Sequence, residues 1–209
     1  DIGGILRGKW LPGDAAAKLM GGSVRLPLST YVPNILGEEV NATGLGSDVG
    51  DPDGTLVPVP GTLTSVPWAE GNAAQVLVEM TDEDGAVAFV SSREALRRVL
   101  DRFAARGLTP IVATELEFYI TELRESPDDP PTPPAMAPLA QNYDLEVMDR
   151  SAGILDAIRA ASDALGLPTD TLIAEYGPGQ FEINFHHTDD ALYAAEIALM
   201  FRRLVRGTV

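Results

Sequence analysis

Glu175-Tyr-Gly-Pro-Gly-Gln-Phe-Glu182 is the stretch of sequence on which the prediction of the fold depends. Two segments rich in apolar residues, 171–176 and 180–187, flank its Gly-Pro-Gly centre. Glycine and proline in such positions are typical of a tight turn between strands. We therefore expect two strands joined across residues 177–179, a turn that can bring Glu175 and Glu182 to one end of a sheet. Incidental surface glutamates on a hairpin are the alternative interpretation.

A second pair of acidic residues lies upstream, in a segment rich in β-branched and aromatic residues that predicts a core strand over residues 110–120. Glu115 and Glu117 flank Leu116, and the two-residue period of a strand puts both carboxylates on one face. Two adjacent like charges either shift a pKa or are held by a cation, and acidic oxygens suit Mg²⁺ or Mn²⁺ better than Zn²⁺. A solvated strand face would carry the same residues. Glutamates on neighbouring strands favour the metal site, which is typical of phosphoryl transfer.

The remaining segments predict a mixed α and β chain. The region before residue 85 is rich in glycine and predicts short strands at residues 2–7, 24–28, 56–59 and 75–80. Apolar residues then recur at helical spacing in three later segments. These helices are expected from Ser91 to Gly107, from about Asp149 to Leu165 with Ile154 on the apolar face, and after Thr188 as the cap. A proline-rich surface loop is expected at residues 126–138.

Composition excludes several classes of function. Lys and Arg number 15 against 31 Asp and Glu, a net charge of −16, which disfavours nucleic acid and anionic membranes as partners. Cysteine is absent, so thiolate metal sites and cysteine catalysis are excluded. No apolar run approaches the ~20 residues of a membrane span, and we expect a cytoplasmic protein. His186 and His187 are adjacent and would point to opposite faces of a strand, so one of them could line a site; structural roles for both are the alternative interpretation.

The two glutamate motifs, in this order, resemble those of the glutamine synthetase family. The resemblance extends to Asp1-Ile-Gly-Gly-Ile-Leu-Arg-Gly-Lys9, to Pro60-Gly-Thr-Leu-Thr-Ser-Val-Pro-Trp68 and to Ala164-Leu-Gly-Leu-Pro168, so it covers nearly the whole chain. The amino-acid sequences of these segments most resemble the γ-glutamylpolyamine synthetase-like branch of the family.

The resemblance implies an α+β architecture, with an N-terminal β-grasp domain over residues 1–84 and the first part of a catalytic α/β domain over residues 85–209. It implies an ATP-dependent ligase that joins glutamate to ammonia or an amine through a γ-glutamyl phosphate, with Mg²⁺ or Mn²⁺ as cofactor. The residues that match the family's site are Glu117, Glu175 and Glu182 for one metal, Glu115 for the other metal, Asp170 and His187 for the nucleotide, and Tyr143 for the amine pocket.

The family also raises expectations about assembly and length. Its members form stacked rings with active sites between subunits, and they are considerably longer than 209 residues. We therefore expect a truncated piece that is inactive alone and has an exposed sheet edge. Two alternatives stay open: a non-catalytic relative that serves as an assembly or binding module, and an unrelated acidic α+β protein in which the two glutamate motifs lie far apart.

Overall fold

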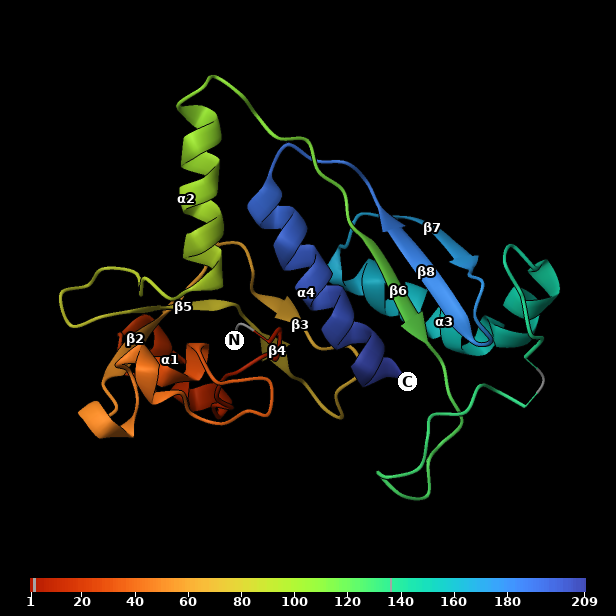
Figure 1. Ribbon diagram of the computed structural model, residues 1–209, viewed down its shortest axis with the longest axis horizontal. Helices are drawn as coiled ribbons and strands as arrows, with labels where there is room; N and C mark the ends of the chain where they lie inside the picture. The colour runs from red at the N-terminus through yellow and green to blue at the C-terminus, as the bar shows by residue number, and fades with distance from the viewer. Residues whose placement is uncertain (2, 136) are drawn as a thin grey trace. The chain divides into compact units, whose positions relative to one another are not determined.

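The computed structural model describes residue 1, residues 3–135 and residues 137–209 (Figure 1). The chain divides into two compact units, one made of residues 1–65 and 73–109 and the other of residues 66–72 and 110–209. Each unit combines helices with antiparallel sheet, which agrees with the mixed α and β class expected from the sequence. The expected domain division at residues 84 and 85 stays a prediction.

The first unit is built on a three-stranded antiparallel sheet in the order β1-β2-β5. Its strands and short helices are β1 (Arg25–Pro27), β2 (Asp53–Pro58), β5 (Val78–Thr81), the pair β3 (Thr64–Ser65) and β4 (Ala74–Gln75), α1 (Ala16–Met20), and the 3₁₀ turns η1 (Gly13–Ala15), η2 (Leu28–Tyr31), η3 (Asn41–Thr43) and η4 (Ser47–Val49). Val24, Leu56, Met80 and Ala88 form the buried core of this unit.

The strand expected at residues 2–7 is wrong for residues 3–7, which form no strand, and Ile2 lies outside the described residues. The Asp1 carboxylate accepts a hydrogen bond from the Ile5 amide at 2.9 Å and pairs with Arg7 at 2.8 Å. These local bonds replace the ladder that a strand would need. The other three expected strands overlap β1, β2, and β4 with β5.

Helix α2 (Ser92–Ala104) begins where the sequence predicts. Ser91 is its N-cap, and the Ser91 hydroxyl accepts a hydrogen bond from the Glu94 amide at 3.3 Å. The Glu94 carboxylate pairs with Arg97, which also pairs with Glu79 on β5 at 3.0 Å. This ion-pair network ties α2 to the sheet of the first unit and raises the pKa of Arg97, chiefly through its bond to Glu79.

The second unit carries a three-stranded antiparallel sheet in the order β6-β8-β7, with β8 at its centre (Figure 1). The strands are β6 (Glu115–Tyr119), β7 (Thr169–Ala174) and β8 (Gln180–Phe185). Helices α3 (Leu145–Leu165) and α4 (Ala191–Thr208) both pack on the face of β8 that carries Ile183 and Phe185. Burial of these apolar side chains leaves the opposite face of the sheet free of either helix.

Four details of the second unit differ from the sequence-based expectations. Helix α3 begins four residues early because the Asp144 carboxylate caps it, and Leu155, rather than Ile154, is buried on its apolar face. The cap of α4 is Asp190 instead of Thr188, whose hydroxyl accepts from the Asp190 amide. The strand expected over residues 110–120 is confined to β6, preceded by a single bridge at Val112.

Within the described part of residues 126–138, the chain forms neither helix nor strand, as expected of a loop, and Met136 lies outside the described residues.

None of the described helices is both long enough and apolar enough to cross a membrane.

Candidate metal centre

The helix-free face of the second sheet is polar because residues alternate along its strands. On β6, Glu115 and Glu117 are exposed, whereas Leu116 and Phe118 lie against the cores. On β8, residues 180, 182 and 184 share one face by the same period. The antiparallel register places Glu117 directly opposite Glu182 and Glu115 opposite Asn184. The sheet therefore pairs glutamates from segments far apart in the sequence.

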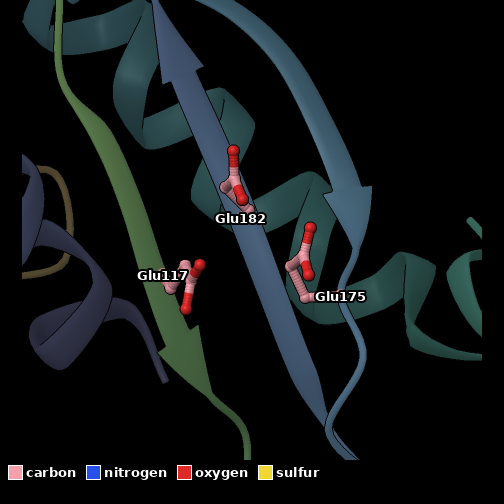
Figure 2. Close-up of side chains that lie close together, drawn as sticks. All are labelled: Glu117, Glu175 and Glu182. Atoms are coloured by element: carbon pink, nitrogen blue, oxygen red, sulfur yellow. The ribbon is translucent and has the colours of Figure 1, made fainter. Parts of the chain in front are cut away.

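Three of the four predicted metal ligands converge. Carboxylate oxygens of Glu117, Glu175 and Glu182 all lie within 4.8 Å of one another. Figure 2 shows their side chains on one side of the sheet, from β6, from β8 and from the end of β7, with α3 behind. Glu175 follows β7 directly, and its amide donates to the Gln180 carbonyl at 3.0 Å, which brings the two ends of the turn together. The alternative in which the two glutamate motifs lie far apart is excluded by this geometry.

Glu182 is the least solvated member of the cluster, with 9% of its surface exposed. Burial raises the pKa of Glu182, and the negative charges of Glu115, Glu175 and Glu117 raise it further, while the Asn184 side chain opposes the rise. Within the described residues, none of the three clustered carboxylates forms an ion pair with a lysine or arginine. A concentration of negative charge with no cationic partner favours protonation or a bound cation.

The donor set fits a divalent cation. Hard oxygen ligands from several carboxylates are the environment that Mg²⁺ and Mn²⁺ prefer. Glu117 and Glu182 lie on paired strands, and Glu175 directly follows β7, where its amide is hydrogen-bonded to the first residue of β8, so the sheet fixes the spacing of the three carboxylates. Acidic groups on an exposed surface often lack an ion, but here one of the three is buried, and that burial distinguishes this cluster from a solvated acidic surface.

Glu115, the fourth predicted ligand, lies on the same strand but faces an adjoining open hollow of about 470 Å³. Asp170 and His187 line the same hollow, together with Asn184. The structure thus brings together the three residues that the family resemblance assigns to the nucleotide side. His186 lies beside Asp170, with its Nδ1 3.9 Å from the carboxylate.

Tyr143 precedes α3, and its backbone is hydrogen-bonded to the segment that carries Glu175. Its amide donates a hydrogen bond to the carbonyl of Ala174, the residue before Glu175, at 2.9 Å. Its backbone has φ 59°, a left-handed conformation that tyrosine rarely adopts, and its side chain is exposed. Such strained positions persist only where the surrounding structure holds them, and they are common at functional sites.

Three polar residues of this region were not predicted from the sequence: Gln141, Gln180 and Asn184. Gln180 and Asn184 stand two residues on either side of Glu182, so the strand period already placed them on the acidic face. Gln141, which is 1% exposed, follows the proline-rich loop, where no periodic pattern signals a role.

Comparison with known proteins identifies the family of this chain. The family model described as "Glutamine synthetase, catalytic domain" matches residues 89–209. Gamma-glutamylputrescine synthetase PuuA of Escherichia coli (strain K12) is 38% identical over 212 residues, covering 99% of this chain and 45% of that protein. Glutamate–isopropylamine ligase of a Pseudomonas species is 30% identical over 164 residues, covering 77% of this chain and 35% of that protein.

A solved structure described as a novel glutamine synthase homolog has the same fold, with a TM-score of 0.81 and 21% sequence identity. It covers 98% of this chain and 45% of the solved chain. The present chain thus spans less than half the length of these relatives. Because the catalytic-domain match takes in more than half of the 209 residues, the chain belongs to the glutamine synthetase family.

Proposed function

We propose that this chain is the N-terminal part of an ATP-dependent ligase that joins the γ-carboxyl group of glutamate to an amine of the polyamine type or to ammonia. The observation that carries the proposal is the convergence of the Glu117, Glu175 and Glu182 carboxylates on one face of the sheet. The names of the relatives support an amine as acceptor, since the putrescine and isopropylamine ligases both match along most of this chain.

Each predicted site residue has a proposed role. Glu117, Glu175 and Glu182 hold one Mg²⁺ or Mn²⁺, and Glu115 is a ligand of a second cation on the nucleotide side. Asp170 and His187 contact ATP, which is supported by the hollow that they line together with Glu115. Tyr143 lines the amine pocket, which is supported by its hydrogen bond beside Glu175.

The proposed reaction has two chemical steps. A carboxylate is a poor acyl donor, so the γ-carboxylate of glutamate first takes the terminal phosphoryl group of ATP and ADP leaves. The amine then attacks the acyl carbon, loses a proton and displaces phosphate, which forms the amide. When bound by these carboxylates, divalent cations would neutralise the charge that develops on the phosphoryl oxygens. The chain's own contribution is to hold the carboxylates in one place: the sheet fixes Glu117 opposite Glu182, and burial keeps water from competing at Glu182.

The proposal extends to the architecture of the whole protein. Residues 1–84 form a β-grasp domain, and residues 85–209 begin the catalytic domain of a cytoplasmic enzyme that assembles into rings and acts in polyamine metabolism or glutamine biosynthesis. The short coverage of the relatives supports a longer parent protein whose remaining segments complete the site. Residues 1–209 alone are therefore expected to be inactive, and ligase turnover from this chain by itself would refute that expectation.

The decisive experiment measures ADP release by the full-length protein with ATP, Mg²⁺, glutamate and a panel of acceptors: putrescine, isopropylamine and ammonia. We expect ADP release to depend on one acceptor and on glutamate, and Glu117→Ala to abolish it. The matched control is Glu146→Gln, which alters an exposed glutamate in the first turn of α3. The proposal fails if no acceptor stimulates turnover and Glu117→Ala changes nothing. If the protein also binds no Mn²⁺ by calorimetry, the non-catalytic module becomes the better account.

A further inference from the structure

Gln180 connects the tight turn to the acidic cluster through the two ends of its side chain. Its Oε1 accepts a hydrogen bond from the Gly177 amide at 2.8 Å, and its Nε2 donates to Oε2 of Glu117 at 2.7 Å. The backbone donor at Gly177 fixes which end of the amide faces the carboxylate. Gln180 lies opposite Tyr119 in the ladder, so it reaches Glu117 along the cross-strand diagonal.

Gln141 holds the same turn through two hydrogen bonds to its backbone. Its Nε2 donates to the Gln180 carbonyl at 2.7 Å, and its Oε1 accepts from the Gly179 amide at 3.0 Å. The side chain is 1% exposed, and both ends of the amide are satisfied by backbone. A buried side-chain amide with two backbone partners restricts the turn far more than an exposed one, because losing either bond leaves a buried polar group unpaired.

The space around the turn leaves little room for movement. Gly179 has φ 76°, and a Cβ atom there would lie 2.5 Å from the Ile120 carbonyl oxygen and 2.8 Å from Pro134 Cδ. The turn is therefore enclosed by the loop that follows β6 and by the Gln141 side chain. Glu175 and Glu182 stand at its two ends, so a rigid turn fixes their separation.

Glu117 needs a partner of this kind. It is exposed on an edge strand, and its carboxylate faces the negative charges of Glu175 and Glu182. Repulsion alone would favour rotamers that turn it toward solvent. The Gln180 amide is the one hydrogen-bond donor found on the Glu117 carboxylate within the described residues, and it holds that carboxylate beside the other two.

We propose that Gln141 and Gln180 are positioning residues for the metal centre: Gln141 fixes the turn between Glu175 and Glu182, and Gln180 orients the Glu117 carboxylate toward them. This inference rests on the proposed function, because it assumes that the cluster binds a divalent cation. Outer partners of this type commonly change metal affinity by about 10–100-fold when they are removed.

The test is calorimetric titration of Mn²⁺ into the full-length, EDTA-treated protein, below the unfolding temperature of every variant. Glu117→Ala identifies the binding sites that belong to the cluster. Gln180→Met keeps the side-chain length without a donor, and we expect it to weaken those sites by about 10–100-fold with little change in unfolding temperature. Gln141→Met should weaken them and also lower the unfolding temperature. The matched control is Gln75→Met, which changes the one other glutamine of the 209-residue sequence and lies in the first unit.

The outcomes separate the two proposals. If the wild type binds Mn²⁺ and both variants bind it with unchanged affinity while folded, the two glutamines have no positioning role, although the proposed function stands. If Gln141→Met lowers the unfolding temperature alone, its role is structural and that half of the inference is overturned. If the wild type binds no Mn²⁺, both the metal centre and this inference are refuted.

Discussion

Glu117 on β6 lies directly opposite Glu182 on β8, so the antiparallel ladder holds two carboxylates face to face. Like charges in this position destabilise a sheet, and here a third carboxylate, from Glu175, joins them. Packing offers no reason for the arrangement, because the apolar cores of this unit lie on the other face of the sheet. The arrangement supports the proposed cation, which would bind both carboxylates.

Cation binding should stabilise the folded protein through this cluster. We expect saturating Mn²⁺ to raise the unfolding temperature of the wild type and of Glu146→Gln, since a ligand at ~100 times its Kd contributes about 2.7 kcal/mol. Glu182→Gln should lose most of this increase, because an amide is a weaker ligand than a carboxylate. Differential scanning calorimetry with and without EDTA measures the effect, and an equal increase in Glu182→Gln would contradict it.

The raised pKa of Glu182 predicts how stability varies with pH in the metal-free protein. Folding raises this pKa above its unfolded value, so the folded state binds the proton more tightly. The resulting stabilisation is complete below the unfolded pKa and is lost as the pH rises through the folded pKa. The free energy of unfolding of the wild type, relative to Glu182→Gln, should therefore fall as the pH rises above about 4.3, the usual value for glutamate.

Urea unfolding of both proteins in EDTA across a pH series measures this difference. Adding Mn²⁺ should remove the decrease for the wild type at neutral pH, because the cation binds the ionised carboxylate. Parallel pH profiles for the two proteins would show that Glu182 titrates normally.

The left-handed backbone at Tyr143 predicts an unusual order of stability among its variants. This conformation costs about 1–2 kcal/mol for a residue with a Cβ atom, and glycine avoids that cost. Glycine loses part of the gain through its more flexible unfolded state. We expect Tyr143→Gly to be more stable than Tyr143→Ala by roughly 0.5–1 kcal/mol in urea unfolding.

The control for Tyr143 is an ordinary helical position. Ala160→Gly, at an exposed site in α3, should cost about 1 kcal/mol, the opposite sign. If alanine proves better than glycine at position 143 as well, the strained conformation is not present in solution. Both Tyr143 variants should raise the KM for the amine if the ring lines its pocket.

Steric enclosure at Gly179 predicts that Gly179→Ala lowers the free energy of unfolding by more than its positive φ alone would. Gly179 and Gly166 both have positive φ, but a Cβ at Gly166 meets nothing within 4 Å, whereas one at Gly179 meets the Ile120 carbonyl oxygen. Gly166→Ala should cost about 1 kcal/mol for the angle. Gly179→Ala should cost at least about twice as much and weaken Mn²⁺ binding, because the turn must shift. Equal losses in unfolding free energy would show that the loop gives way freely.

The sequence predicts the secondary structure around the site well where the signal is local. Ser91 and Glu94 predict the start of α2, and the Gly-Pro-Gly turn predicts the pairing of β7 with β8. Alternation in Glu115-Leu-Glu117 predicts the acidic face. Each of these inferences depends on residues within a few positions of one another, where geometry follows from one strand or one helix.

The details that the sequence did not predict correctly share a different physical cause. Thr188 and Asp190 are both suitable caps, and only the path of the chain after β8 decides between them. Ile154 and Leu155 are both apolar, and the packing of α3 on the sheet buries Leu155 in one cluster with Phe181. Gln141 meets its two backbone partners only when the loop after β6 lies against the turn. Such choices are made by tertiary contacts that no local pattern contains.

The separation of the site's residues along the chain has a consequence for folding. Gln180 and Glu117 are 63 residues apart, and they meet only when β6 pairs with β8. Contacts of such long range form slowly, because the intervening chain must first lose conformational freedom. An unfolded chain therefore has no site that binds a cation tightly. In a refolding experiment, the uptake of Mn²⁺ would therefore report when β6 pairs with β8, and it could not precede that pairing.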